Sequence, residues 1–192
     1  AVIDALASRL RQVIPAVQPD ILHAHSPALN GIAALRVAKA FRLPLVYEVR
    51  AFWEDAAVDH GTCREGDHRY RATRALETYV LKRAAAVTCI CEWLRGDIAA
   101  RGISPGKVTV IPNAVDIEHF QTGVAPDEVL QRRLRLNGHT VLGFIGSFYA
   151  YEGLKLLLDA MPRLLDARSD ARLLLVGGGF EEQRLQRQAQ EL

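Results

Sequence analysis

Residues 87–120 read VTCICEWLRGDIAARGISPGKVTVIPNAVDIEHF, and this stretch decides the fold class. An apolar run at residues 85–90 predicts a buried strand, and residues 91–102 predict a helix that Gly102 ends. The apolar run at residues 107–112 predicts the next strand. A helix between two short apolar strands is typical of a βαβ unit, because parallel strands need a crossover connection. The stretch therefore indicates an α/β fold with a parallel sheet.

The same alternation continues toward both ends of the chain. Further strands are predicted at residues 20–25, 43–49, 140–146 and 171–176. Helices are predicted at residues 1–17, 27–41, 67–84, 127–136 and 154–167, with another opening at Phe180, and a loop is predicted at residues 50–66. Residues 113–128 lack a long apolar period and predict a linker. The chain is therefore expected to form two incomplete Rossmann-like halves, residues 1–119 and residues 120–192.

Composition excludes several classes of protein. The chain has 192 residues, and its 24 Lys and Arg against 22 Asp and Glu give a net charge of +2. The basic residues are scattered, so we expect no nucleic-acid partner. Cys63, Cys89 and Cys91 lack zinc-ligand spacing, which favours reduced thiols in a cytosolic protein. No apolar run reaches about 18 residues, so no membrane span is predicted.

The ends of the chain indicate a piece of a longer protein. It begins without Met, inside a predicted helix, and its second half offers only two strands. Two strands are too few for a stable parallel sheet, so the remaining strands are expected from a longer chain or a second molecule. An unpaired sheet edge would then favour a homodimer or strand exchange.

The stretch HAHSP, residues 23–27, ends a predicted strand with two histidines on one face. A metal pair would need further ligands at other strand ends, but the nearest candidates, Asp55 to His68, lie in or beside one loop. We therefore predict no metal. His25 is expected to reach the cleft at the carboxyl edge of the sheet, whereas His23 is expected to face the core or the next strand.

Two glycine-rich stretches and one basic helix leave alternatives open. GSFYAYEG (146–153) and VGGG (176–179) each lie between a strand and a helix, where free amides could bind an anion; tight turns are the alternative. Arg71, Arg74 and Lys82 share one face of the helix at 67–84, as either a solvated face or a surface for phosphate or anionic membranes.

Three stretches together resemble the retaining glycosyltransferases of family 4: PDILHAHSP (19–27), residues 87–120, and LGFIGSFYAYEGLKLLLDAMPRLLDARSDARLLLVGGG (142–179). The resemblance implies a GT-B fold, with the C-terminal part of an acceptor domain at residues 1–119 and the interdomain linker and start of a donor-binding domain at 120–192. Within that family, YEVRAFWEDAAVDHGT (47–62) and GSFYAYEG (146–153) resemble the glycosyltransferases associated with exosortase and exopolysaccharide gene clusters.

The resemblance also implies roles for individual residues. His25 matches the histidine near the transferred sugar and is the catalytic candidate. Gly146, Ser147, Phe148 and Gly153 are implied at the donor phosphate, and Gly177, Gly178 and Gly179 in a donor-side loop. Asn113 and Asp116 match the interdomain motif, and Glu48, Arg50 and Asp55 fall on the acceptor side. Arg and Lys are usual in the phosphate loop where this chain has Ser147 and Glu152, so the backbone amides of Ser147 and Phe148, or a cation from a C-terminal part outside this chain, would have to substitute.

The implied function is transfer of a hexose from a nucleotide-diphosphate sugar, with retention, to a saccharide or lipid-linked acceptor in cell-surface polysaccharide biosynthesis. No cofactor is expected, since the nucleotide sugar is the substrate. The protein is expected in the cytoplasm or at the inner face of the membrane with peripheral contact, and this chain alone is expected to be inactive. The alternatives are a sugar-nucleotide epimerase and a non-catalytic nucleotide-binding or interaction module.

Overall fold

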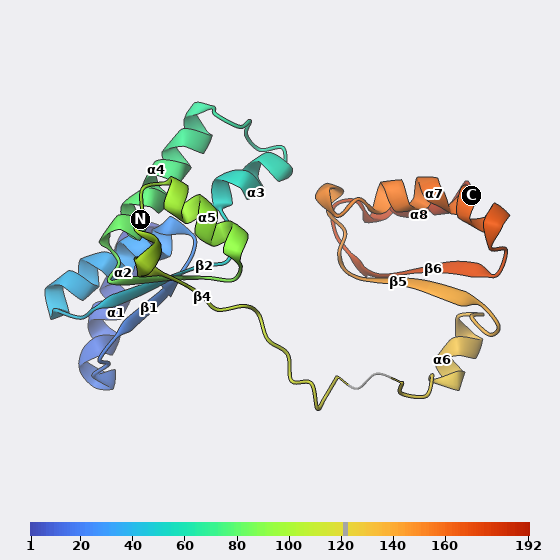
Figure 1. Cartoon of the computed structure of the whole chain (residues 1–192), viewed down its shortest axis with the longest axis horizontal. Coiled ribbons are helices and arrows are strands. Elements are labelled where there is room, and N and C mark those ends of the chain that lie inside the picture. The colour runs from blue at the N-terminus through green and yellow to red at the C-terminus, as the bar shows by residue number, and fades with distance from the viewer. Residues whose placement is uncertain (121–122) are drawn as a thin grey trace. The chain divides into compact units, whose positions relative to one another are not determined.

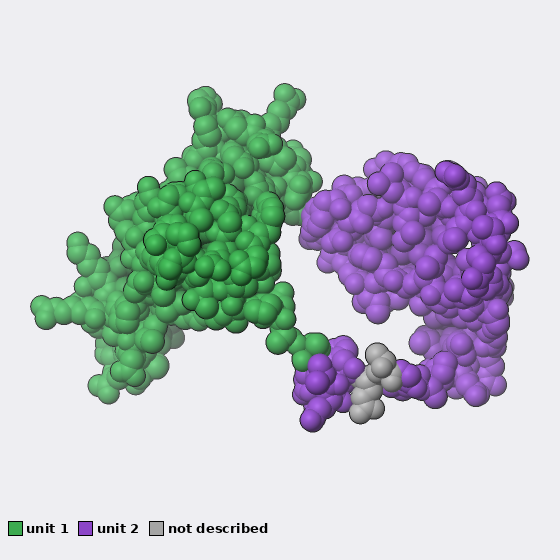
Figure 2. Space-filling view, viewed as in Figure 1, with its two compact units in different colours: residues 1–115 green, residues 116–192 purple. Residues whose placement is uncertain are grey.

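A computed structural model describes residues 1–120 and 123–192 (Figure 1). These residues form two compact units, Ala1–Val115 and Asp116–Leu192 (Figure 2). The predicted linker at 113–128 includes residues 121–122, which lie outside the described residues. The assignment of acceptor and donor roles to the two halves stays a prediction.

The first unit is built on a parallel sheet of four strands in the order β1-β2-β3-β4. The strands are β1 (Leu22–His25), β2 (Leu45–Val49), β3 (Ala86–Cys89) and β4 (Val108–Val110). All neighbouring pairs are parallel, which confirms the predicted α/β class. In the register of β1 with β2, His23 lies opposite Val46 and His25 opposite Glu48. The polar ends of these two strands are therefore adjacent.

The helices of this unit are α1 (Val2–Val17), α2 (Ala28–Phe41), α3 (Trp53–Asp59), α4 (His68–Arg83) and α5 (Glu92–Ala100). Alternate residues of β2 point to opposite faces, so the buried Tyr47 faces α2 and α4 while Glu48 faces the other way. A Cβ on Gly31 of α2 would lie 2.5 Å from Val80 Cγ1 and 2.8 Å from Tyr47 Cε2. Only glycine therefore lets α2, α4 and β2 pack this closely.

The predicted loop at residues 50–66 is wrong in one part, because it contains α3. This helix has seven residues and no long apolar period, so periodicity could not reveal it. The side chain of Glu54 is buried and pairs with the buried Arg101, and this ion pair ties the helix to the core. The helix predicted at 127–136 is shorter in the structure, where α6 spans Glu128–Arg133.

The second unit pairs β5 (Thr140–Ser147) with β6 (Ala171–Gly178) in parallel, and its other helices are α7 (Leu154–Ala167) and α8 (Glu182–Gln190). Its core is small and includes Phe148, Leu158 and Leu185. Register places Gly146 opposite Gly177, so the two glycine-rich stretches lie side by side. Across the described parts of both units, no helix combines the length and apolar composition that crossing a membrane requires.

Asp67 caps α4, as the sequence predicts, and its removal should destabilise the protein measurably. Its carboxylate accepts hydrogen bonds from the amides of Tyr70 at 2.7 Å and Arg64 at 3.0 Å, and these bonds hold its pKa below the usual range. We expect Asp67→Ala to lower the free energy of unfolding by about 1 kcal/mol in urea denaturation. Glu65→Ala, at an exposed neighbouring carboxylate, is the control. Equal stability of the two variants would contradict the cap.

Candidate active site

The carboxyl ends of β1 and β2 bring His23, His25 and Glu48 together. His23 Nε2 lies 3.2 Å from one carboxylate oxygen of Glu48, and His25 Nδ1 lies 3.5 Å from the other. The two imidazole rings stack with their centroids 4.8 Å apart. The carboxylate is largely buried, at 18% side-chain exposure, while both histidines are about half exposed. Glu48 is therefore a fixed anchor for two accessible imidazoles.

Arg50 extends this cluster toward the end of the first unit. Its guanidinium contacts Glu48 Oε1 at 3.3 Å and Asn113 Oδ1 at 3.0 Å. Its backbone amide lies 3.4 Å from the hydroxyl of Ser26, directly after His25. Four of the predicted site residues, His25, Glu48, Arg50 and Asn113, thus form one connected network.

Glu77 of α4 holds the segment that follows His25. The fully buried carboxylate accepts hydrogen bonds from the amide of Ala28, the first residue of α2, at 2.9 Å and from the hydroxyl of Tyr47 at 2.5 Å. A carboxylate at a helix N-terminus is stabilised by the free amides there. Burial nevertheless dominates and raises the pKa of Glu77. Burial, with the adjacent Glu77, also raises the pKa of Tyr47.

A groove of about 760 Å³ opens beside Arg50. Its walls come from the turn after β1, from α3 and from α4, and they include Ser26, Trp53 and Arg69. Most of the lining is apolar, and Arg50 and Arg69 contribute its two guanidinium groups. The groove can therefore accept a ligand that has both an apolar part and an anionic or hydroxyl-rich part.

His23, His25 and Glu48 are also the one group in the described chain whose side chains could jointly ligate a metal ion, with their ligand atoms within 4.8 Å of one another. The candidate ligands named from the sequence all follow β2, whereas Glu48 lies within that strand. His23, predicted to face the core or the next strand, contacts Glu48 of the next strand and is about half exposed, so it does not face the core. Because Arg50 already supplies a cation to Glu48, a metal-free site remains our prediction.

Asp55 and Asp116 make contacts away from this network. Asp55 accepts a hydrogen bond from the hydroxyl of Tyr70 at 2.9 Å, which ties α3 to α4. Asp116 belongs to the second unit, where it contacts His119 Nδ1 at 2.7 Å and accepts from the amide of Glu118. The contact with His119 lowers the pKa of Asp116. Both carboxylates have a structural use that the sequence did not reveal.

Close packing explains two of the glycines in the donor-side loop. A Cβ on Gly177 would overlap the carbonyl oxygen of Gly146, and one on Gly179 would lie 2.9 Å from the carbonyl oxygen of Phe148. Both have φ near 149°, which L side chains rarely adopt. The tight-turn alternative therefore accounts for these two positions, and their role toward a donor stays a prediction.

The predicted phosphate loop lies between β5 and α7. Phe148 is buried and its amide donates to the carbonyl of Gly178 at 2.9 Å, so this N–H is already paired. Gly153 has φ 73° and is followed directly by α7, whose first amides lack partners within the helix. Ser147 and Glu152 are both exposed. Anion binding here would therefore depend on the start of α7 more than on Phe148.

Two sequence profiles match the chain. The profile described as "Glycosyltransferase Family 4" matches residues 3–119. The chain belongs to glycosyltransferase family 4. In this family 4 chain, the profile described as "Glycosyl transferases group 1" matches residues 139–192. The predicted family is thus confirmed; the first profile extends into the predicted linker at 113–128, and the second begins after it.

This family 4 chain is 27% identical over 178 residues to the GDP-mannose-dependent alpha-mannosyltransferase of Mycobacterium tuberculosis (strain CDC 1551 / Oshkosh), covering 93% of the chain and 44% of that relative. HepE of Anabaena, solved in complex with UDP and glucose, aligns with a TM-score of 0.75 and 18% identity over 97% of this chain and 48% of HepE. The UDP-GlcNAc 2-epimerase of Neisseria meningitidis bound to UDP-GlcNAc aligns with a TM-score of 0.57 and 14% identity over 99% of this chain and 50% of the epimerase. These likenesses show the GT-B fold, and the chain spans about half the length of each.

Sequence reasoning missed His23 and Glu77 as parts of this family 4 site. The i, i+2 spacing puts His23 on the same face as His25, but the sequence analysis predicts only His25 at the cleft. Glu77 is the only acidic residue between His68 and Arg83 and lies among apolar helix positions, which was a usable signal. Buried carboxylates of this kind are retained where hydrogen-bond donors surround them.

Proposed function

We propose that the protein containing this chain transfers a hexose from a nucleotide-diphosphate sugar to an acceptor, with retention, in cell-surface polysaccharide biosynthesis. The observation that carries the proposal is the network of His25, Glu48, Arg50 and Asn113 at the strand ends of a family 4 chain. An imidazole, a carboxylate and a guanidinium offer both acceptors and donors for sugar hydroxyls. His25 is the candidate closest to the transferred sugar.

The proposed acceptor is a saccharide or a lipid-linked saccharide in the groove beside Arg50. The mostly apolar lining suits a lipid portion, while Arg50 and Arg69 suit an anionic or hydroxylated portion. The donor diphosphate is assigned to the start of α7 near Gly146, Ser147 and Gly153, where helix amides favour an anion. The reaction is assigned to the cytoplasmic side of the membrane.

A donor panel tests the transfer. The intact protein is incubated with GDP-mannose, UDP-glucose and UDP-GlcNAc and with saccharide and lipid-linked acceptors. Release of nucleoside diphosphate coupled to a product of retained anomeric configuration is expected with one donor. His25→Ala should lower this rate at least about 10-fold, a loss of ~1.4 kcal/mol in transition-state stabilisation, whereas the exposed His68→Ala should not.

Different outcomes separate the other candidates. Formation of an epimerised nucleotide sugar without any acceptor would show that the protein is an epimerase and not a transferase. The fold that the chain shares with the Neisseria epimerase is the reason to test this outcome. Tight nucleotide binding without turnover would favour a non-catalytic binding module. The reason to consider this outcome is that Ser147 and Glu152 stand where Arg and Lys are usual in the phosphate loop. Absence of transfer and of donor hydrolysis with every donor and acceptor would reject the proposal.

A further inference from the structure

Helix α4 carries charge of one sign on its exposed side. Tyr70, Glu77, Val80 and Leu81 are buried, so the opposite side of the helix faces outward. That side carries Arg71, Lys82 and Arg83, and the half-buried Arg74 lies at its border. Glu77 is the only acidic residue of the helix, and it is buried. On a helix face that is only solvated, basic residues usually have acidic residues three or four positions away. No exposed acidic residue lies on α4.

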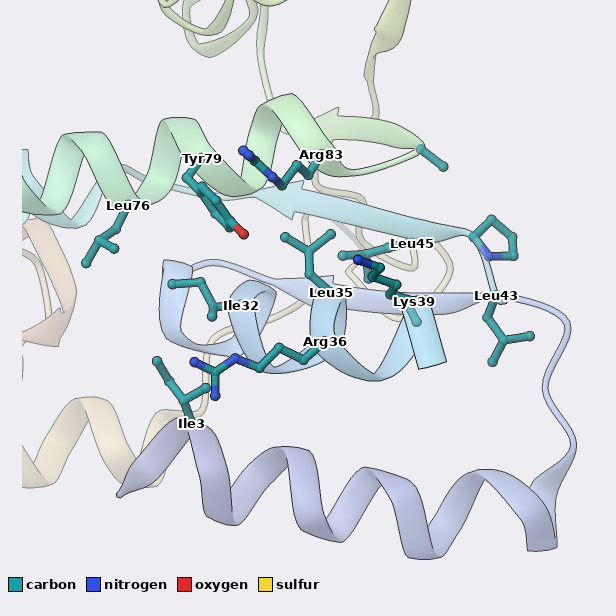
Figure 3. A pocket seen from close by; sticks show the side chains of 13 residues that line it. Ile3, Ile32, Leu35, Arg36, Lys39, Leu43, Leu45, Leu76, Tyr79 and Arg83 are labelled. Atoms are coloured by element: carbon teal, nitrogen blue, oxygen red, sulfur yellow. The ribbon is translucent and has the colours of Figure 1, made fainter. Parts of the chain in front are cut away.

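Apolar side chains lie among these cations. Leu76 and Tyr79 are each 44% exposed, and the guanidinium carbon of Arg83 lies 3.8 Å from the centroid of the Tyr79 ring. Both residues line a groove of about 740 Å³ beside α2, and Figure 3 shows their side chains directed toward that helix. Arg36 and Lys39 of α2 line the same groove. Cations and apolar groups therefore share one continuous surface.

We call this the α2–α4 surface: Arg36, Lys39, Arg71, Arg74, Leu76, Tyr79, Lys82 and Arg83. Of its cations, Arg36 has a carboxylate partner, Asp4, at 2.9 Å, and Arg71 contacts the imidazole of His68 at 3.1 Å. No other ion pair to these cations occurs among the described residues, which exclude 121–122. The surface therefore keeps most of its positive charge available to a partner.

We propose that the α2–α4 surface docks on a bilayer that contains anionic lipids. Long Lys and Arg side chains reach headgroup phosphates, while an aliphatic and an aromatic side chain between them enter the interfacial layer. The exposed apolar groups favour a bilayer over a nucleic acid, which would instead be read through phosphates and base edges. This inference goes beyond the proposed function, because docking requires no sugar transfer.

Vesicle binding tests the surface. The intact protein is mixed with phosphatidylglycerol–phosphatidylcholine vesicles and with pure phosphatidylcholine vesicles, and the bound fraction is measured by sedimentation. We expect binding to the anionic vesicles that weakens with added salt. R71Q/K82Q should lower the partition coefficient about 30-fold, since each cation near an anionic membrane contributes ~1 kcal/mol. Tyr79→Ser should lower it about 5-fold through lost apolar burial.

The matched control is R184Q/R187Q on α8, which makes the same change in net charge in the other unit. Its vesicle binding should equal that of the unaltered protein, and circular dichroism should report the same helix content for all variants. Equal binding to neutral vesicles, equal loss in the control, or binding to duplex DNA that matches binding to vesicles would each overturn the proposal. Sugar transfer is measured separately, so failure of docking and failure of the proposed function are distinguishable.

Discussion

Arg101→Met is expected to lower the free energy of unfolding by about 3–5 kcal/mol, because it leaves the carboxylate of Glu54 buried without its cation. Arg101 Nη1 lies 2.7 Å from Glu54 Oε1, and the two side chains are 1% and 0% exposed. The guanidinium also contacts Asp97 at 3.2 Å and lies 3.4 Å above the ring of Phe52. Methionine would keep part of this packing but none of the charge.

Urea denaturation of the intact protein, followed by circular dichroism, measures the loss. Arg95→Met is the matched control, since Arg95 lies on α5, the helix that Arg101 directly follows, and pairs with the exposed Glu92. Its effect should stay within about 0.5 kcal/mol. Removing both buried charges in E54L/R101M should recover much of the stability, because no unpaired ion remains. A loss below ~1 kcal/mol in Arg101→Met would show that the pair does not hold α3 in place.

The parallel sheets could be predicted because each strand is a short apolar run flanked by a helix with its own period. Helix α3 could not, since its seven residues contain a charge that becomes acceptable only beside Arg101. That partner is 47 residues away in the sequence. Local pattern therefore predicts elements that are stabilised by their own periodicity, and it misses those stabilised by one distant pair.

The candidate site divides in the same way. The end of β1 placed His25 at the sheet edge, and the end of β2 placed Glu48 and Arg50 beside it, as parallel neighbours must be. The link to Asn113 depends on the direction of the Arg50 side chain, which no strand pattern specifies. Asp55 and Gly177 were predicted at the site, but each has a structural contact instead. Asp55 accepts a hydrogen bond from Tyr70, and Gly177 packs against the carbonyl group of Gly146.

Glu77→Ala should lower the free energy of unfolding by about 2–4 kcal/mol. It leaves the amide of Ala28 and the hydroxyl of Tyr47 buried without an acceptor, and it opens a cavity between α2 and α4. Because Ala28 follows the turn at Ser26, the variant should also reduce sugar transfer through a displaced His25. Urea denaturation measures the first effect. Thr78→Ala, at the next residue of α4, is the control.

Glu77→Gln separates the charge of this carboxyl from its shape. Burial raises the pKa of Glu77 above its ordinary value of 4.5, so the folded protein retains a proton at pH values where the unfolded chain has lost it. Stability must then fall as pH rises above about 4.5 until the folded-state pKa is passed, because the folded state binds more protons in that window. Glutamine cannot titrate, so the stability of the unaltered protein relative to Glu77→Gln should fall across the same window. A difference that rises with pH would mean that hydrogen bonds from Ala28 and Tyr47 outweigh burial and hold the carboxylate ionised.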